Sequence, residues 1–161
     1  MSTDDETHLS PYRIIEREKA ACRRAVLPPD PGWPAEVRLL YREAVARAFE
    51  EGVTAGAIVE ACGLEDNNAY SLFKYTVGKG VKELIVACRL ACAKALLRKG
   101  AQLLVTEIAY AVGYSSPSGF SSTFKRHVGS APSEYRDGEN EERNDEKKVE
   151  KENEKNVRKE R

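Results

Sequence analysis

Apolar residues recur at helical spacing along much of this chain. After Pro34 they fall three and four positions apart, which predicts an amphipathic helix that begins at the proline and ends at Gly52. Residues 79–99 are apolar over much of their circumference. A long helix packed by a separate core near each end would show this pattern. The prolines between residues 28 and 34 end any helix that precedes them.

The middle of the chain repeats itself at an interval of about 50 residues. Two sets of residues correspond, each predicting a two-turn helix with an apolar stripe stopped by glycine: Ala55, Ile58, Val59, Cys62 and Gly63, then Val105, Ile108, Ala109, Val112 and Gly113. Past the glycine the interval becomes 51, because the second copy has one extra turn residue, so Phe73 matches Phe124. Each copy is therefore interpreted as helix, glycine turn and helix, the layout of a helix-turn-helix.

The second helix of each copy has one apolar and one polar face. The apolar residues are Ala69, Leu72 and Phe73 in the first copy, and Phe120 and Phe124 in the second. The polar faces carry Asn67, Tyr70, Ser71 and Lys74, and Ser118, Ser121, Ser122 and Lys125. Short polar side chains allow a helix to approach base edges, and a cation serves the phosphates. An ordinary solvated face is the alternative, but its recurrence at matching positions favours a reader of the DNA major groove.

Charge and composition narrow the class of protein. The chain has 161 residues and a formal net charge of zero, yet residues 67–133 hold nine basic against two acidic side chains. A basic middle is compatible with a polyanion partner that touches only this part. No apolar run could span a bilayer and the first residues are acidic, so we expect a single soluble cytoplasmic domain with no membrane contact.

The cysteines and histidines do not predict a metal or cofactor site. Cys88 and Cys92 lie one helical turn apart, but neither they nor Cys22 and Cys62 form a C-x-x-C pair, and both histidines lie far away in sequence. Buried thiols in a reducing compartment are favoured. No catalytic triad, paired carboxylates or phosphate loop is visible, so no enzyme activity is expected.

Residues 105–136 resemble the signature of the AraC/XylS family of bacterial transcription regulators. The segment reads VTEIAYAVGYSSPSGFSSTFKRHVGSAPSEYR, and residues 84–97 also match the spacing of that family's linker helix. The resemblance covers about residues 36–136. It implies an all-α domain of about seven helices, with two helix-turn-helix subdomains joined by a long linker helix. Each subdomain would place its second helix in one of two successive major grooves.

Composition and the resemblance together give the following domain boundaries. Residues 1–33 are a polar extension, expected to be a disordered arm; residues 34–136 are the DNA-binding domain, divided into 34–78, the linker helix 79–99, and 100–136; residues 137–161 are a charged tail, either disordered or a solvated helix. Many family members carry a metabolite-binding barrel before this domain. Since 33 residues are too few for such a barrel, we expect no small-molecule effector domain.

The candidate DNA-binding residues come from both polar faces and the turns beside them. They are Asn67, Asn68, Tyr70, Ser71, Lys74, Ser116, Ser118, Ser121, Ser122, Lys125 and Arg126. Asn67 and Asn68 are the candidates for adenine readout. Ser71 and Ser122 stand where the family commonly has a longer polar residue, and Ala131 stands where a Ser or Thr usually caps the last helix. Modest sequence discrimination is therefore expected.

The predicted function is a sequence-specific transcription regulator that binds double-stranded DNA. The family resemblance implies an activator that contacts RNA polymerase. Two alternatives stay open: a protein-interaction module on a degenerate helix-turn-helix scaffold, suggested by the serine-rich faces, and a DNA-binding fragment related to DNA-repair methyltransferase regulators. The second is suggested by Cys22 and the two arginines that follow it.

Overall fold

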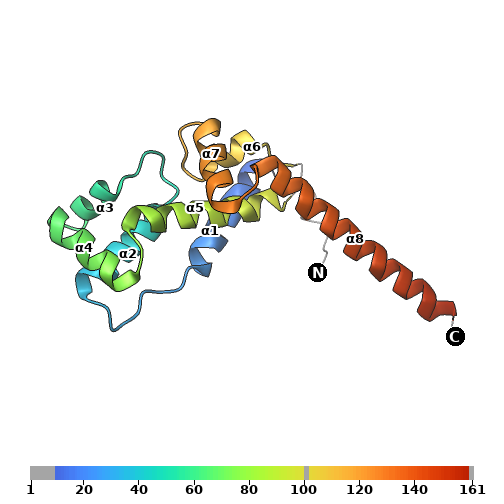
Figure 1. Ribbon diagram of the computed structural model, residues 1–161, viewed down its shortest axis with the longest axis horizontal. Coiled ribbons are helices and arrows are strands. Elements are labelled where there is room, and N and C mark those ends of the chain that lie inside the picture. The colour runs from blue at the N-terminus through green and yellow to red at the C-terminus, as the bar shows by residue number, and fades with distance from the viewer. Residues whose placement is uncertain (1–9, 100–101, 160–161) are drawn as a thin grey trace.

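A computed structural model describes residues 10–99 and 102–159, and within these ranges every regular element is an α-helix (Figure 1). The helices are α1 (Pro11–Ala25), α2 (Ala35–Arg47), α3 (Ala55–Ala61), α4 (Asp66–Val77), α5 (Val81–Leu97), α6 (Val105–Ala111), α7 (Pro117–Val128) and α8 (Pro132–Lys159). The pair α3–α4 and the pair α6–α7 are the two predicted helix-turn-helix units, and α5 joins them. The predicted all-α fold with a linker helix is confirmed.

A side-chain hydroxyl caps one helix in each unit. The hydroxyl of Thr54 accepts a hydrogen bond from the backbone N–H of Ala57 at 3.1 Å, which caps α3. The Ser116 hydroxyl caps α7 in the same way, accepting from the N–H of Gly119 at 3.2 Å. At its other end α7 stops at Gly129, whose φ of +94° is a left-handed conformation that glycine adopts without strain.

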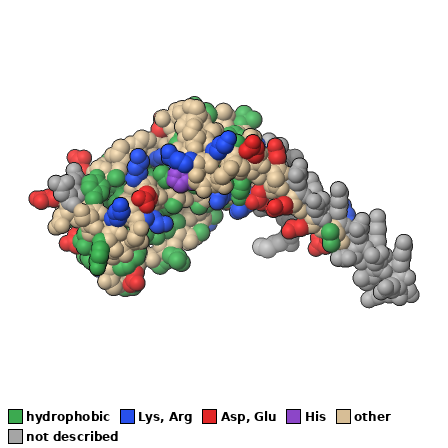
Figure 2. Space-filling view, in the orientation of Figure 1, with side chains coloured by type: hydrophobic (Ala, Val, Ile, Leu, Met, Phe, Trp, Pro, Cys, Tyr) green, Lys and Arg blue, Asp and Glu red, His purple; other side chains and the backbone are tan. Residues whose placement is uncertain are grey.

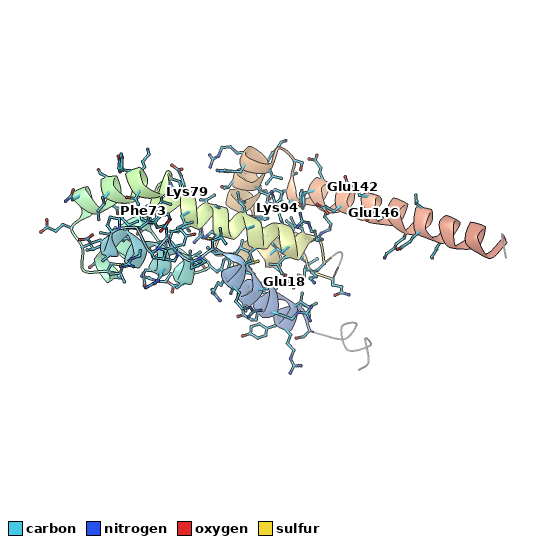
Figure 3. All side chains as sticks on the ribbon, turned by 90° about the horizontal axis from the view of Figure 1, so that it is seen from below. Glu18, Phe73, Lys79, Lys94, Glu142 and Glu146 are labelled. Atoms are coloured by element: carbon cyan, nitrogen blue, oxygen red, sulfur yellow. The ribbon has the colours of Figure 1, made fainter. Side chains whose placement is uncertain are left out.

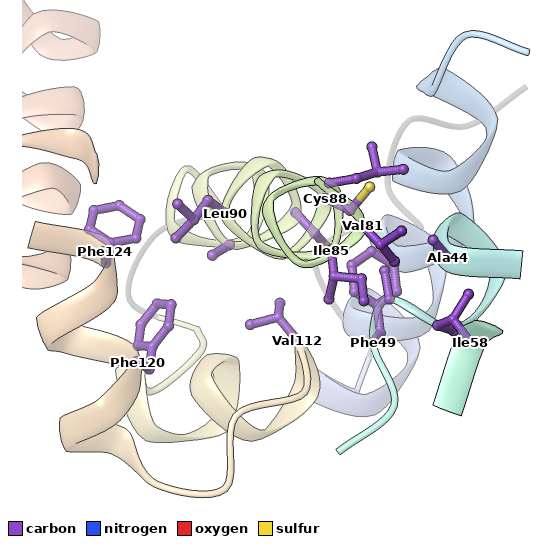
Figure 4. Packing of buried hydrophobic residues seen from close by; sticks show 14 of the residues in the cluster. Ala44, Phe49, Ile58, Val81, Ile85, Cys88, Leu90, Val112, Phe120 and Phe124 are labelled. Atoms are coloured by element: carbon purple, nitrogen blue, oxygen red, sulfur yellow. The ribbon is translucent and has the colours of Figure 1, made fainter. Parts of the chain in front are cut away.

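Helix α5 lies at the centre of the fold, as the buried residues on more than one of its sides show. In Figure 4, Leu90 on one side faces Phe120 and Phe124 of α7, whereas Val81 lies toward Phe49, next to the first unit. The buried side chains form one continuous cluster rather than the two separate cores expected from the sequence. The apolar positions around α5 are close enough along the helix to join the two halves.

The N-terminal extension is ordered over most of its length, so the prediction of a disordered arm is wrong for the residues described. Pro11–Ala25 forms α1, which packs against α5. Ile14 is 7% exposed, and the carboxylate of Glu18 lies 3.2 Å from the ammonium nitrogen of Lys99. The apolar stripe that includes Ile14 and Cys22 supplies the contact that a purely polar arm would lack. Residues 1–9 of the predicted arm lie outside the described residues.

The charged tail continues helix α8. Of the two alternatives left open by the sequence, a disordered tail or a solvated helix, the structure shows the helix. The first turns of α8, which precede the tail, pack against the rest of the protein. The ring of Tyr135 lies 5.6 Å from that of Phe124, and the Tyr135 hydroxyl accepts a hydrogen bond from Arg98 at 2.7 Å. Beyond these turns the helix runs away from both units (Figures 1 and 3), and Glu142 and Glu146 are exposed. The tail therefore adds a solvated helix.

Candidate nucleic-acid interface

The predicted DNA-contacting residues on α4 divide by exposure. Asn68, Ser71 and Lys74 are exposed, so they share an accessible face of the helix. Tyr70 is half-buried, and its hydroxyl would lie 3.6 Å from a Cβ atom added at Gly56 of α3. Tyr70 thus supports the packing of α3 against α4. Asn67 belongs to α4, but the placement of its side chain lies outside what the structure describes.

Helix α7 presents a similar face in the second unit. Ser118, Ser122, Lys125 and Arg126 are exposed, while Ser121 is half-buried. The hydroxyl of the sixth predicted residue of this unit, Ser116, is occupied by the cap of α7 and lies 3.4 Å from the hydroxyl of Ser118. Its position is therefore fixed by the helix start.

Tyr75 is an accessible residue on this surface that the sequence reasoning missed. Its side chain is 90% exposed on α4, one position after Lys74. At the repeat interval of 51, Tyr75 corresponds to Arg126 of α7, which was predicted to bind DNA. The repeat could have identified it, since an aromatic ring offers both an apolar face and a hydroxyl donor to a nucleic acid.

A basic groove lies between α5 and the C-terminal end of α7. It encloses about 380 Å³ and is lined by Lys79, Lys82, Glu83, Val86, Ala87, Leu90, Arg126 and His127. Figure 2 shows blue basic side chains gathered on this face around a purple histidine, with acidic side chains concentrated elsewhere apart from one nearby. Lys82 lies in the first turn of α5 and Lys79 lies just before that helix. The sequence analysis did not include either lysine in the interface.

One buried arginine of the linker helix connects the two units. Arg89 donates from Nε to the carbonyl oxygen of Ala48 at 2.6 Å and from a terminal nitrogen to that of Glu50 at 2.8 Å, and both acceptors lie in the segment that joins α2 to the first unit. Its guanidinium also stacks over the ring of Tyr114 at 5.2 Å, next to Gly113 in the second unit. Burial lowers the pKa of Arg89 from its ordinary value. This contact fixes how the two units sit on α5.

The thiols are placed as packing groups. Cys88 and Cys92 are buried and Cys22 and Cys62 half-buried, and burial raises the pKa of all four thiols, which keeps them protonated at neutral pH. Cys22, on α1, packs against the hydrophobic core cluster. Within residues 10–99 and 102–159, no three His, Cys, Asp or Glu side chains gather where a metal ion would fit.

The length and hydropathy of the helices decide whether any of them could cross a membrane. None of those formed by the described residues combines the length and apolar character that crossing a bilayer requires.

Comparison with known families identifies this arrangement. A family model described as a helix-turn-helix domain matches residues 58–138, half of the chain. The match begins in α3 and ends in the first turns of α8, so it includes both helix-turn-helix units and the linker helix.

Individual relatives are transcription regulators. The chain is 29% identical over 136 residues to the xylose operon regulatory protein of Escherichia coli K12, covering 78% of this chain and 34% of that protein. It is 35% identical over 107 residues to a putative AraC-like transcription regulator of Streptomyces lividans, covering 66% of this chain and 33% of the relative. The chain thus spans about a third of the length of these relatives.

A solved structure shares the fold. The DNA-binding domain of AdpA, a global transcriptional factor, in complex with a target DNA, superposes with a TM-score of 0.54 at 24% identity. The alignment covers 61% of this chain and 90% of that domain.

Proposed function

The chain belongs to the AraC-type helix-turn-helix family, and from that premise we propose that it is a sequence-specific, DNA-binding regulator of transcription. The observation that carries the proposal is the duplicated arrangement of α4 and α7. Each is the second helix of its unit, and each exposes short polar side chains with a lysine near its C-terminal end. Short polar residues suit base edges and the lysines suit phosphates.

The two helices enter adjacent major grooves of one duplex. Successive major grooves on one face of B-DNA are about 34 Å apart, so a single chain with two reading helices occupies two of them without a second copy. Arg89 supports this mode of binding, because it ties the end of α2 to the turn before α7 through α5. Two units held in one orientation bind DNA without first having to be ordered.

The contacts divide between the two helices by type. Asn68, Ser71, Ser118 and Ser122 face the bases, whereas Lys74, Lys125 and Arg126 bind phosphate. The serines are short, so sequence discrimination is modest and is complemented by DNA shape. Bound in this way in the cytoplasm, the regulator activates transcription through contact with RNA polymerase, as the family resemblance implies.

Selection of duplexes from random DNA followed by titration tests the proposal. A recovered duplex should show two protected major grooves about one helical turn apart, and affinity should fall steeply with salt. Changing Lys125 and Arg126 together to alanine should weaken binding to all sequences and reduce the log-log salt slope by about 0.9 per lost phosphate contact. Lys147→Ala, an exposed lysine of α8, is the matched control. Failure to recover any duplex that binds in a salt-dependent manner would overturn the proposal.

A further inference from the structure

We propose that the groove between α5 and α7 binds the DNA phosphate backbone that runs between the two major grooves, with Lys79 and Lys82 of the linker helix as its main ligands. This inference rests on the proposed function and extends it to a part of the chain outside both helix-turn-helix units. The DNA contact surface would then be continuous from α4 across α5 to α7.

The position of the groove supports this assignment. Lys79 follows Gly78, the C-cap residue of α4, and Arg126, which lies on the exposed face of α7, lines the same groove from the other side. Between two successive major grooves on one face, a duplex presents its minor groove, which is bordered by the backbones of both strands. Since α5 joins the two units, the strand segment between the two major grooves passes over it.

The charges of the groove complement a polyphosphate. Lys79, Lys82 and Arg126 contribute three positive charges, against one negative charge from Glu83. Among the described residues, neither lysine forms an ion pair or a hydrogen bond with the protein. Their ammonium groups are therefore available to an external anion.

Lys82 also occupies an unfavourable place for helix stability. It lies in the first turn of α5, whereas Lys79 lies between the C-cap residue Gly78 of α4 and the N-cap residue Gly80 of α5. The N-terminus of a helix carries a partial positive charge, so a cation there destabilises the helix, by roughly 0.3 to 1 kcal/mol when exposed. The basic residues at the end of α7 are explained by the favourable dipole at a C-terminus, whereas Lys82 is not. A phosphate ligand gives Lys82 a purpose that folding does not.

The floor of the groove allows the DNA backbone to approach α5 closely. Val86, Ala87 and Leu90 line it between the charged side chains, and Ala87 is exposed with only a methyl group. His127 lies at the edge, where its Nδ1 atom is 2.9 Å from the carbonyl oxygen of Thr123. That bond leaves Nε2 as the ring nitrogen available to the groove.

Three variants test the assignment on the full chain with a duplex recovered by selection. Changing Lys79 and Lys82 together to alanine should reduce affinity about five- to tenfold per lysine near 0.1 M salt and lower the log-log salt slope by about 1 to 2. The order of preference among duplex sequences should stay the same, since phosphates carry no sequence information. Glu83→Gln should act in the opposite direction and raise affinity, because it removes the acidic charge of the groove.

Lys147→Ala serves as the control for loss of one lysine remote from the groove. Thermal unfolding should show that the double lysine variant is about as stable as the parent chain, because Lys82 is unfavourably placed at the start of α5 and Lys79 lies between the ends of two helices with opposing dipoles. An unchanged salt slope in the double variant, while the parent chain still binds DNA with a steep slope, would overturn the groove assignment and leave the proposed function intact. A parent chain that binds no duplex would overturn both.

Discussion

A Cβ atom at Gly113 would lie 2.9 Å from a terminal guanidinium nitrogen of Arg89. Gly113 follows α6, and its φ of +100° is a conformation that residues with a side chain rarely adopt. The absence of a side chain here lets the guanidinium reach Tyr114 while it bonds the carbonyl oxygens of Ala48 and Glu50. Glycine at this position thus serves both a turn and a contact between the two units.

Gly113→Ala should destabilise the protein more than the equivalent change in the first unit. Gly63 occupies the matching position of the repeat, with a φ of +67° and nothing within 4 Å of an added Cβ. Both variants carry the backbone strain of a left-handed alanine, about 1 kcal/mol or more, and only Gly113→Ala adds a collision with a buried guanidinium. Urea unfolding of the two variants measures the difference. Equal losses of unfolding free energy would mean that Arg89 moves aside freely.

Arg89→Met should cost about 2 to 3 kcal/mol, because two carbonyl oxygens lose their donor in a buried place. In this background Gly113→Ala should retain only its backbone strain, since the colliding group is gone. A double-mutant cycle that combines the two changes should therefore show clear non-additivity. Strictly additive free energies would contradict the contact between these residues.

Phe124→Ala should cost about 3 to 5 kcal/mol and remove both helical signal and DNA binding. Phe124 is fully buried, and its ring lies 5.6 Å from the rings of both Phe120 and Tyr135. Phe124→Leu keeps most of the apolar volume and should lose less. Circular dichroism during thermal unfolding compares the two. Full thermal stability of the alanine variant would contradict the placement of α7 in the core.

The helices and their repeat could be predicted from sequence because periodic burial leaves a local pattern. Phe73 and Phe124 recur at a fixed interval and both are fully buried. Arg89 gave no such signal: a basic residue within an apolar stripe is ordinarily assigned to solvent, and its acceptors lie about 40 positions earlier in the chain. Its role depends on tertiary contacts.

The N-terminal helix was missed for a related reason. The polar residues of α1 dominate its composition, and the partner that buries Ile14 is α5, far along the chain. Lys79 and Lys82 were likewise counted only as part of a basic region, because the groove they line is formed by α5 meeting α7. Which candidate residues bind DNA stays a prediction, although their exposure on α4 and α7 is compatible with it.

Ala131→Ser should stabilise the protein by roughly 0.5 to 1 kcal/mol. The carboxylate of Glu134 already accepts a hydrogen bond from the N–H of Ala131 at 2.8 Å, which is one half of a capping box at the start of α8. A serine hydroxyl would supply the other half by accepting from the N–H of Glu134. Thermal unfolding measures the gain. Ser133→Ala, a change at an exposed residue two positions further along the chain, is a control. A destabilised Ala131→Ser variant would show that the hydroxyl disrupts local packing.

Truncation after Glu142 should leave both stability and DNA affinity nearly unchanged. The cut retains Tyr135, which packs on Phe124, and Glu139, whose carboxylate lies 3.3 Å from Arg98. The described part of the removed segment extends beyond the two units, and Val149 is exposed, so we expect the truncation to remove no core contact (Figure 1).

The acidic residues of the tail could instead compete with phosphate for the basic surface. The course of α8 argues against this competition, because the helix leads away from the groove between α5 and α7. Titration of one duplex with full-length and truncated chains, at low and at physiological salt, separates the two outcomes. Competition would raise the affinity of the truncated chain several-fold at low salt and fade as the Debye length shortens to about 8 Å. Equal affinities at both salt concentrations are expected, since a rigid helix holds its charges where the structure places them.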